Sequence, residues 1–120
     1  MTKQRQGLGR RGEALAAAYL EKAGYRILAR NYRTKGAELD IIARRREELV
    51  FVEVKSRNNS AFGSPFEAVT AAKQRKIAQA AQEYLVREKL AGQAARFDVV
   101  AVSFVGGNPE IEHLPNAFEL

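Results

Sequence analysis

Apolar and polar residues alternate in several short stretches of the chain, and this period of two predicts β-strands. Residues 25–33, 38–44 and 48–56 are rich in β-branched and aromatic residues and are separated by short polar connections. We expect them to form a meander of three strands. Residues 96–104 predict a fourth strand, and residues 110–114 predict a short fifth strand at an edge of the sheet.

Two other stretches carry apolar residues at helical spacing. Residues 8–23 are rich in alanine and predict a helix that ends at Gly24. Residues 70–90 predict a second helix, which follows a loop at residues 63–65. The polar and basic residues 1–7 have no periodicity, and we expect them to be mobile.

The predicted order is therefore helix, three strands, helix and two strands, written α-β-β-β-α-β-β. A strand, a helix and a further strand imply a crossover that makes at least one pair of strands parallel. This order predicts an α/β fold with a mixed β-sheet flanked by helices. The length of 120 residues suits one domain, and no linker or repeat divides it.

Composition excludes several kinds of site. The chain has no cysteine and one histidine, so disulfides, thiolate zinc sites and histidine-rich metal centres are ruled out. Oxygen atoms must therefore hold any metal ion. The longest apolar stretch, residues 14–20, is far shorter than the roughly 20 residues that a membrane span needs. We expect a cytoplasmic protein with no membrane partner.

The positive charge is concentrated in the first half of the chain. The net charge is +6, and residues 1–57 hold 14 Lys and Arg against 7 Asp and Glu. An excess of this kind favours a polyanionic partner, because neutralised phosphates release counterions. Nucleic acid is the partner that this charge suggests.

The stretch FVEVKSR at residues 51–57 places two charges in an apolar strand. Because side chains alternate along a strand, Glu53 and Lys55 point to one face, while Val52 and Val54 point to the other. Glu53 and Lys55 could form an exposed ion pair of little energetic value. They could also be part of a catalytic site.

Asp40 interrupts the preceding strand in the same way, within ELDII. The short connection between the two strands makes them antiparallel neighbours, and a register that brings Asp40 beside Glu53 is easily formed. Two adjacent carboxylates become favourable when Mg²⁺ or Mn²⁺ lies between them. Lys55 could then orient a water molecule or stabilise charge on a phosphate, and this set suits metal-assisted phosphodiester hydrolysis.

Aspartate followed by a strand that ends in Glu-Val-Lys resembles the PD-(D/E)XK signature of the restriction-endonuclease-like superfamily, here Asp40 with Glu53 and Lys55. Longer segments resemble the YraN family of bacterial proteins over about residues 7–118. They are GRRGEALAAAYLEKAGYRILARNYR, ELDIIA, LVFVEVKSR, FGSPFEAVTAAKQRKI, RFDVVAV and NAF. The turn before the second strand differs from the family pattern, because Gly36 stands one position early.

The resemblance implies a fold similar to that of the archaeal Holliday-junction resolvases. It also implies that Glu13, from the first helix, completes a metal-binding set with Asp40 and Glu53. The alternative for Glu13 is a stabilising interaction with the dipole of its helix. By analogy with resolvases, which cut two strands, a homodimer would fit.

Four basic residues are candidates for nucleic-acid contacts. Arg10 and Arg11 precede Glu13 in the sequence, and Arg57 follows Lys55. Lys73 lies near the start of the second helix and could contact a phosphate, although a solvated charge is the alternative.

The sequence supports two functional hypotheses. The first is a magnesium- or manganese-dependent endonuclease that cuts branched or structured DNA, with Asp40, Glu53 and Lys55 as catalytic residues. The second is a non-catalytic nucleic-acid-binding module of the same fold. Salt-sensitive binding that survives the loss of Asp40 would favour the second.

Overall fold

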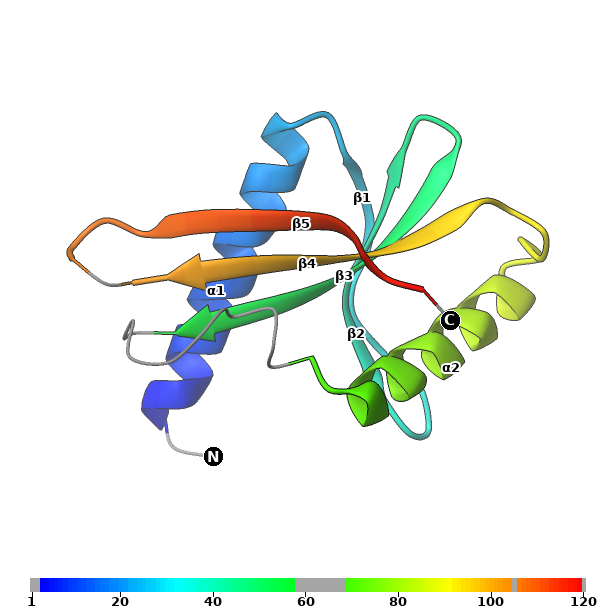
Figure 1. The fold of residues 1–120 in the computed structure, drawn as a ribbon, viewed down its shortest axis with the longest axis horizontal. Coiled ribbons are helices and arrows are strands. Elements are labelled where there is room, and N and C mark those ends of the chain that lie inside the picture. The colour runs from blue at the N-terminus through cyan, green and yellow to red at the C-terminus, as the bar shows by residue number, and fades with distance from the viewer. Residues whose placement is uncertain (1–2, 58–68, 105, 120) are drawn as a thin grey trace.

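A computed structural model of the chain describes residues 3–57, 69–104 and 106–119, and for residues 3–8 it gives the helical backbone alone. The loop expected at residues 63–65 lies outside the described residues. The elements, in chain order, are α1 (Lys3–Lys22), β1 (Arg26–Arg33), β2 (Glu38–Arg45), β3 (Glu48–Arg57), α2 (Ala71–Arg87), β4 (Ala95–Ser103) and β5 (Glu110–Phe118) (Figure 1).

These elements confirm the predicted order α-β-β-β-α-β-β. The five strands form one mixed sheet in the order β1-β2-β3-β4-β5. Neighbouring strands are antiparallel except β3 and β4, which are parallel and joined through α2. β5 lies at an edge of the sheet, as expected.

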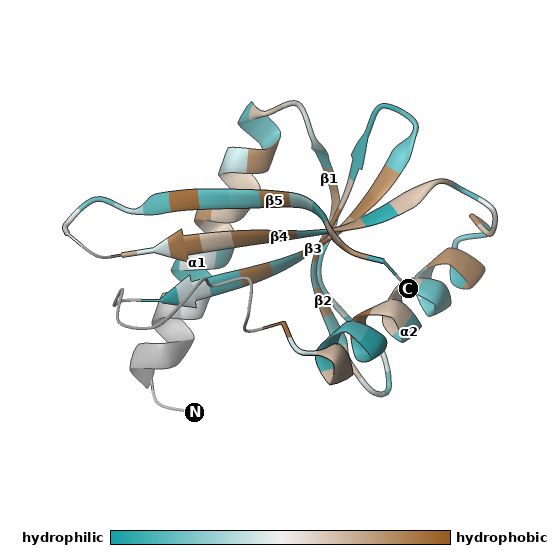
Figure 2. Cartoon of the chain, viewed as in Figure 1, coloured by the Kyte–Doolittle hydropathy of each residue, from teal (hydrophilic) through white to brown (hydrophobic). Residues whose placement is uncertain are grey.

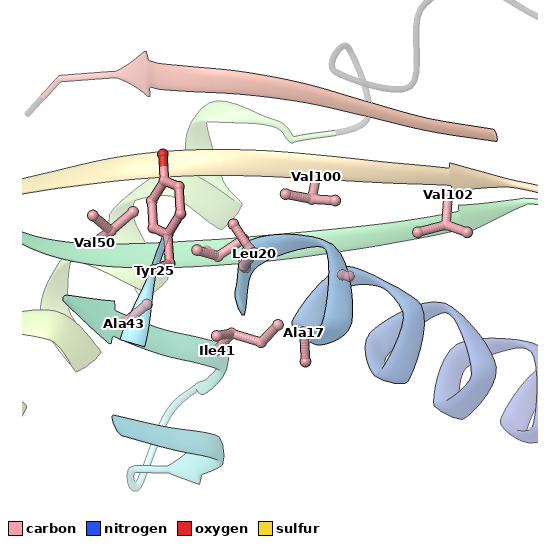
Figure 3. Packing of buried hydrophobic residues seen from close by; sticks show 10 residues of the cluster. Ala17, Leu20, Tyr25, Ile41, Ala43, Val50, Val100 and Val102 are labelled. Atoms are coloured by element: carbon pink, nitrogen blue, oxygen red, sulfur yellow. The ribbon is translucent and has the colours of Figure 1, made fainter. Parts of the chain in front are cut away.

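Both faces of the sheet are covered, because apolar residues occupy both faces of its central strands. On one face α1 packs through Ala16, Ala17 and Leu20 against Val50 and Val100 (Figure 3). Burial of this apolar surface is the main stabilising contribution of the helix. α1 therefore lies on the sheet with its alanine-rich side inward, which allows close approach.

On the other face α2 packs through Ile77, Ala80 and Tyr84 against Phe51 and its neighbours. In Figure 1, α2 lies near β2, on the side of the sheet away from α1. Hydropathy follows this arrangement, with hydrophobic residues along the middle of β3 and β4 and hydrophilic residues at the loops (Figure 2). No helix in the described part of the chain is long and apolar enough to cross a membrane.

Two elements are longer than expected. α1 begins at Lys3 instead of near Leu8. The lysine, arginine and glutamine residues at its start are good helix formers, and they extend a helix that packing has already fixed. β5 continues to Phe118 instead of ending at Leu114. An irregularity in its pairing with β4 accommodates Pro115, which an edge strand tolerates.

Candidate active site

The site is built where β2 and β3 stop pairing. Their register runs from Arg45 opposite Glu48 to Ile41 opposite Val52, and it therefore places Asp40 opposite Glu53. At this point the Asp40 side chain takes over the pairing, because its Oδ2 accepts a hydrogen bond of 2.8 Å from the backbone N–H of Val54. The predicted proximity of Asp40 and Glu53 is confirmed.

The two faces of β3 are not divided into a core face and a solvated face. Leu49 and Phe51 are buried beneath α2 on the face that Glu53 shares. Glu53 itself is only 6 % exposed. The alternative of an exposed surface pair is therefore wrong for Glu53, since its carboxylate has lost most of its hydration.

The strand β2 also departs from simple alternation. Strict alternation would place Leu39 and Ile41 together on the face opposite Asp40. Ile41 does pack on the α1 side, but Leu39 packs with Ile42 on the α2 side. Leu39 lies beyond Ile41, the last β2 residue that pairs with β3, and it pairs with Tyr32 of β1 instead.

Two lysines neutralise the Glu53 carboxylate. The Lys55 ammonium lies 3.8 Å from Glu53 Oε1, and the Lys73 ammonium lies 3.6 Å from the same atom. Lys55 comes from the same strand, as the sequence pattern requires, whereas Lys73 comes from the first turn of α2. Lys73 therefore contacts the carboxylate itself, and it is not simply a solvated charge.

Glu13 lies on α1, on the other side of the sheet. Its Oε1 lies 3.7 Å from Arg30 Nη2 on β1, and within the described residues this oxygen makes no hydrogen bond. Burial raises the pKa of Glu13, and the Arg30 charge lowers it in part. Glu13 is therefore a half-buried acid that faces Arg30, and its charge also reaches Asp40.

Burial changes the acidity of the central pair. Desolvation, followed by the nearby Glu53 charge, raises the pKa of Asp40 to about 7, although the hydrogen bond from Val54 acts in the opposite direction. Desolvation also raises the pKa of Glu53, while Lys73 and Lys55 partly offset the effect. Acids held in this way are favoured in the ionised form when a cation binds between them.

A divalent ion such as Mg²⁺ needs oxygen ligands, which the carboxylates of this site could supply. No group of three or more histidine, cysteine, aspartate or glutamate side chains among residues 3–57, 69–104 and 106–119 is arranged to hold a metal. The set of Glu13, Asp40 and Glu53 is thus not gathered into one cluster here. Asp40 and Glu53 fit Mg²⁺ as a pair, because this ion often takes one or two carboxylates and completes its shell with water and phosphate oxygens.

The predicted basic residues lie around this end of β3. The Arg11 guanidinium lies over the Phe104 ring, 4.7 Å from its centre, next to the end of β4. Arg57 Nε donates a hydrogen bond of 3.3 Å to Ser103 Oγ. Arg10 is exposed on α1. Of the four predicted residues, Lys73 contacts the carboxylate pair directly, whereas Arg11 and Arg57 lie where β3 and β4 end.

Sequence reasoning missed the close contact between Gly12 and Ser56. A Cβ atom added at Gly12 would lie 1.7 Å from Ser56 Oγ. Only glycine lets α1 approach β3 so closely, and the next residue on the helix is Glu13. A glycine within an alanine-rich helix was the available signal, since it weakens the helix unless packing requires it. No comparable signal identified Arg30.

A second polar network lies on the α1 side of the sheet, between β4 and β5. Asp98 is 1 % exposed, and it accepts hydrogen bonds from Arg96, from His113 and from the backbone N–H of Asn116. Burial alone would raise the pKa of Asp98, but these bonds more than offset it and hold the pKa below its usual value. These contacts give Asp98 a structural role, and His113 is a packed residue.

Comparison with known proteins gives a consistent family assignment. The family model described as "Uncharacterised protein family UPF0102" matches residues 12–102. A UPF0102 protein of Geobacter metallireducens is 48 % identical over 120 residues, which cover 100 % of this chain and 98 % of that protein.

Two further relatives have similar identity. A UPF0102 protein of Syntrophotalea carbinolica is 52 % identical over 120 residues, with 100 % of this chain and 98 % of the relative covered. One of Anaeromyxobacter dehalogenans is 51 % identical over 115 residues, with 96 % and 86 % covered. The residues that carry the site, from Glu13 to Lys73, all fall within the matched region, and the chain belongs to the uncharacterised protein family UPF0102, which is the YraN family.

Proposed function

We propose that this protein is a divalent-cation-dependent endonuclease that hydrolyses phosphodiester bonds in branched or otherwise structured DNA. One observation carries the proposal: the half-buried Asp40 carboxylate and the buried Glu53 carboxylate lie side by side where β2 and β3 stop pairing, with the Lys55 ammonium 3.8 Å from Glu53. A purely structural pair would gain stability from replacement by apolar residues, since burying like charges together is costly.

Asp40 and Glu53 would hold Mg²⁺ or Mn²⁺. When bound, such a cation polarises the phosphoryl oxygen and makes water more acidic. The hydrogen bond from Val54 fixes the orientation of Asp40. Lys55 places a positive charge where it can stabilise the additional negative charge that the phosphate develops in the transition state.

The surrounding residues suit a polyanionic substrate. Lys73 contacts Glu53, Arg57 ends the same strand, and Arg11 lies near the end of β4. Together with Arg10 they are proposed to contact the DNA backbone, which would position the scissile phosphate without reading bases. Arg11 is oriented by its stacking on Phe104. The combination of a mixed sheet, Asp40, Glu53 and Lys55 supports membership of the PD-(D/E)XK superfamily, and we further propose a homodimer in the cytoplasm.

The test is cleavage of labelled four-way junction, flap, single-stranded and duplex DNA with Mg²⁺ or Mn²⁺. Wild type is compared with the isosteric double variant Asp40→Asn/Glu53→Gln. The variant Glu110→Gln/Glu112→Gln serves as a control, because it removes the same charge from an exposed part of β5. We expect metal-dependent cutting by wild type and by the control, and none by the site variant.

A second candidate function is a non-catalytic nucleic-acid-binding module. It is favoured by the pairing of Glu13 and Glu53 with cations of the protein itself. DNA binding without cutting by all three proteins, with or without a divalent ion, would support this candidate and overturn the nuclease proposal.

A further inference from the structure

The candidate site is electrically balanced by its own side chains. Each of its two paired acids has a cation nearby: Arg30 is 3.7 Å from Glu13, and Lys73 and Lys55 are 3.6 and 3.8 Å from Glu53. Asp40 has no such ion pair among the described residues, but the charge of Lys73 also acts on it. The carboxylates of Asp40 and Glu53 and the ammonium groups of Lys55 and Lys73 thus leave the central pair close to neutral when all four are ionised.

Lys73 differs from Lys55 in how it reaches Glu53. Lys55 belongs to the same strand, so its position follows from the backbone of β3. Lys73 reaches across from α2, whose start is fixed by the Thr70 hydroxyl accepting a hydrogen bond from the Lys73 backbone N–H. Its backbone is therefore anchored, while its side chain is 44 % exposed and ends on a long stem with several rotatable bonds.

We propose that the Lys73 ammonium is an internal counter-cation of Glu53, which a divalent cation must displace in order to bind between Glu53 and Asp40. This inference rests on the proposed metal-dependent function and assigns Lys73 a role in regulating metal loading. The reason is electrostatic, because an ammonium beside the carboxylate both neutralises it and repels an incoming dication. The displaced ammonium then becomes available to a phosphate of the DNA.

Direct metal binding tests the first part. Mn²⁺ is titrated by calorimetry, without nucleic acid, into wild type, Lys73→Met and Lys76→Met. Methionine keeps the length and helix propensity of lysine but removes its charge. Lys76 is exposed on the same helix and provides a control with the same change in net charge.

We expect Lys73→Met to bind Mn²⁺ about tenfold more tightly than wild type, a coupling of ordinary size between neighbouring sites. Lys76→Met should stay within about twofold of wild type, as an exposed charge is screened by solvent. Equal affinities for wild type and both variants would overturn the inference.

The Asp40→Asn/Glu53→Gln variant separates failure of the inference from failure of the proposed function. If Asp40→Asn/Glu53→Gln loses Mn²⁺ binding and Lys73→Met binds Mn²⁺ as tightly as wild type does, the metal site is supported. The proposed role of Lys73 is then overturned. If none of the proteins binds Mn²⁺, both the metal-dependent function and the inference are overturned.

A second measurement needs no metal. Binding of a labelled four-way DNA junction is measured in EDTA for wild type, Glu53→Gln, Lys73→Met and the double variant. If Glu53 holds Lys73, the loss of Lys73 weakens binding by at least about threefold more in the Glu53→Gln background than in wild type. An equal effect of Lys73→Met in the two backgrounds would show that the ammonium is never sequestered, which overturns the inference.

Discussion

Asp40 Oδ2 accepts a 2.8 Å hydrogen bond from the backbone N–H of Val54 at the point where β2 and β3 separate. The side chain thus replaces a backbone partner that the diverging strand no longer offers. Because a buried N–H without a partner is costly, this bond stabilises the fork between the strands. It also holds Asp40 beside Glu53.

The stability of the protein should fall as Asp40 ionises. The pKa of Asp40 is raised from 3.8 to about 7, so the folded protein binds this proton more tightly than the unfolded chain. Its stabilising contribution is complete below about pH 4 and is lost as the pH rises through 7. Between pH 5 and pH 8, thermal unfolding should show wild type losing roughly 1 to 3 kcal/mol relative to Asp40→Asn.

Asparagine preserves an acceptor for the Val54 N–H, so this comparison isolates the charge of Asp40. The control is Glu112→Gln on β5, whose stability should follow that of wild type across the same pH range. Parallel curves for wild type and Asp40→Asn would contradict the raised pKa of Asp40.

Gly12→Ala should force α1 away from β3. The new methyl group would lie 1.7 Å from Ser56 Oγ, and relief requires the helix or the strand to move. We expect a loss of about 1 to 3 kcal/mol in the free energy of unfolding, measured with urea. Ser56→Gly in the same chain removes the obstructing atoms and should restore part of the loss.

Gly9→Ala is the matched control for the same helix. No atom lies within 4 Å of a Cβ placed at Gly9. Alanine is the better helix former, so this change should stabilise the protein by up to about 1 kcal/mol. If Gly9→Ala and Gly12→Ala destabilise the protein by similar amounts, the loss at Gly12 would come from a change in the helix and not from its contact with Ser56.

Asp98→Ala should be among the most damaging single substitutions at the polar network. It removes the carboxylate that accepts from Arg96 Nε at 2.9 Å and lies 2.7 Å from His113 Nε2. Leaving the Arg96 charge without this partner should cost about 3 to 5 kcal/mol in urea unfolding. A cost comparable to that of the exposed Glu112→Ala, expected within about 0.5 kcal/mol of wild type, would contradict this role.

Arg11→Ala should weaken DNA binding in a salt-dependent manner. If Arg11 contacts a phosphate, the slope of log affinity against log salt should decrease by about one, and binding should weaken similarly for all DNA sequences. Fluorescence anisotropy with a four-way junction measures both. Arg26→Ala is the control, because Arg26 pairs with Arg44 at the opposite end of the sheet; equal effects of the two variants would indicate a non-specific charge effect.

Much of the fold could be predicted from the sequence because its local periods are strong. Alternation in residues 48–56 determines that Glu53 and Lys55 share a face, and the short connection to the preceding strand places Asp40 within reach of them. The boundaries were less accurate at β5, where pairing at the edge extends past a proline that would end a central strand.

What only the tertiary structure decided is how the layers cover these side chains. A period of two gives a strand its two faces, but it does not say whether the face that carries Glu53 meets solvent or α2. Docking of α2 buries Glu53 and places Lys73 beside it. Docking of α1 places Gly12 against Ser56 and Glu13 near Arg30. These contacts join residues far apart in the chain, so their distances depend on helix packing, which no local sequence pattern encodes.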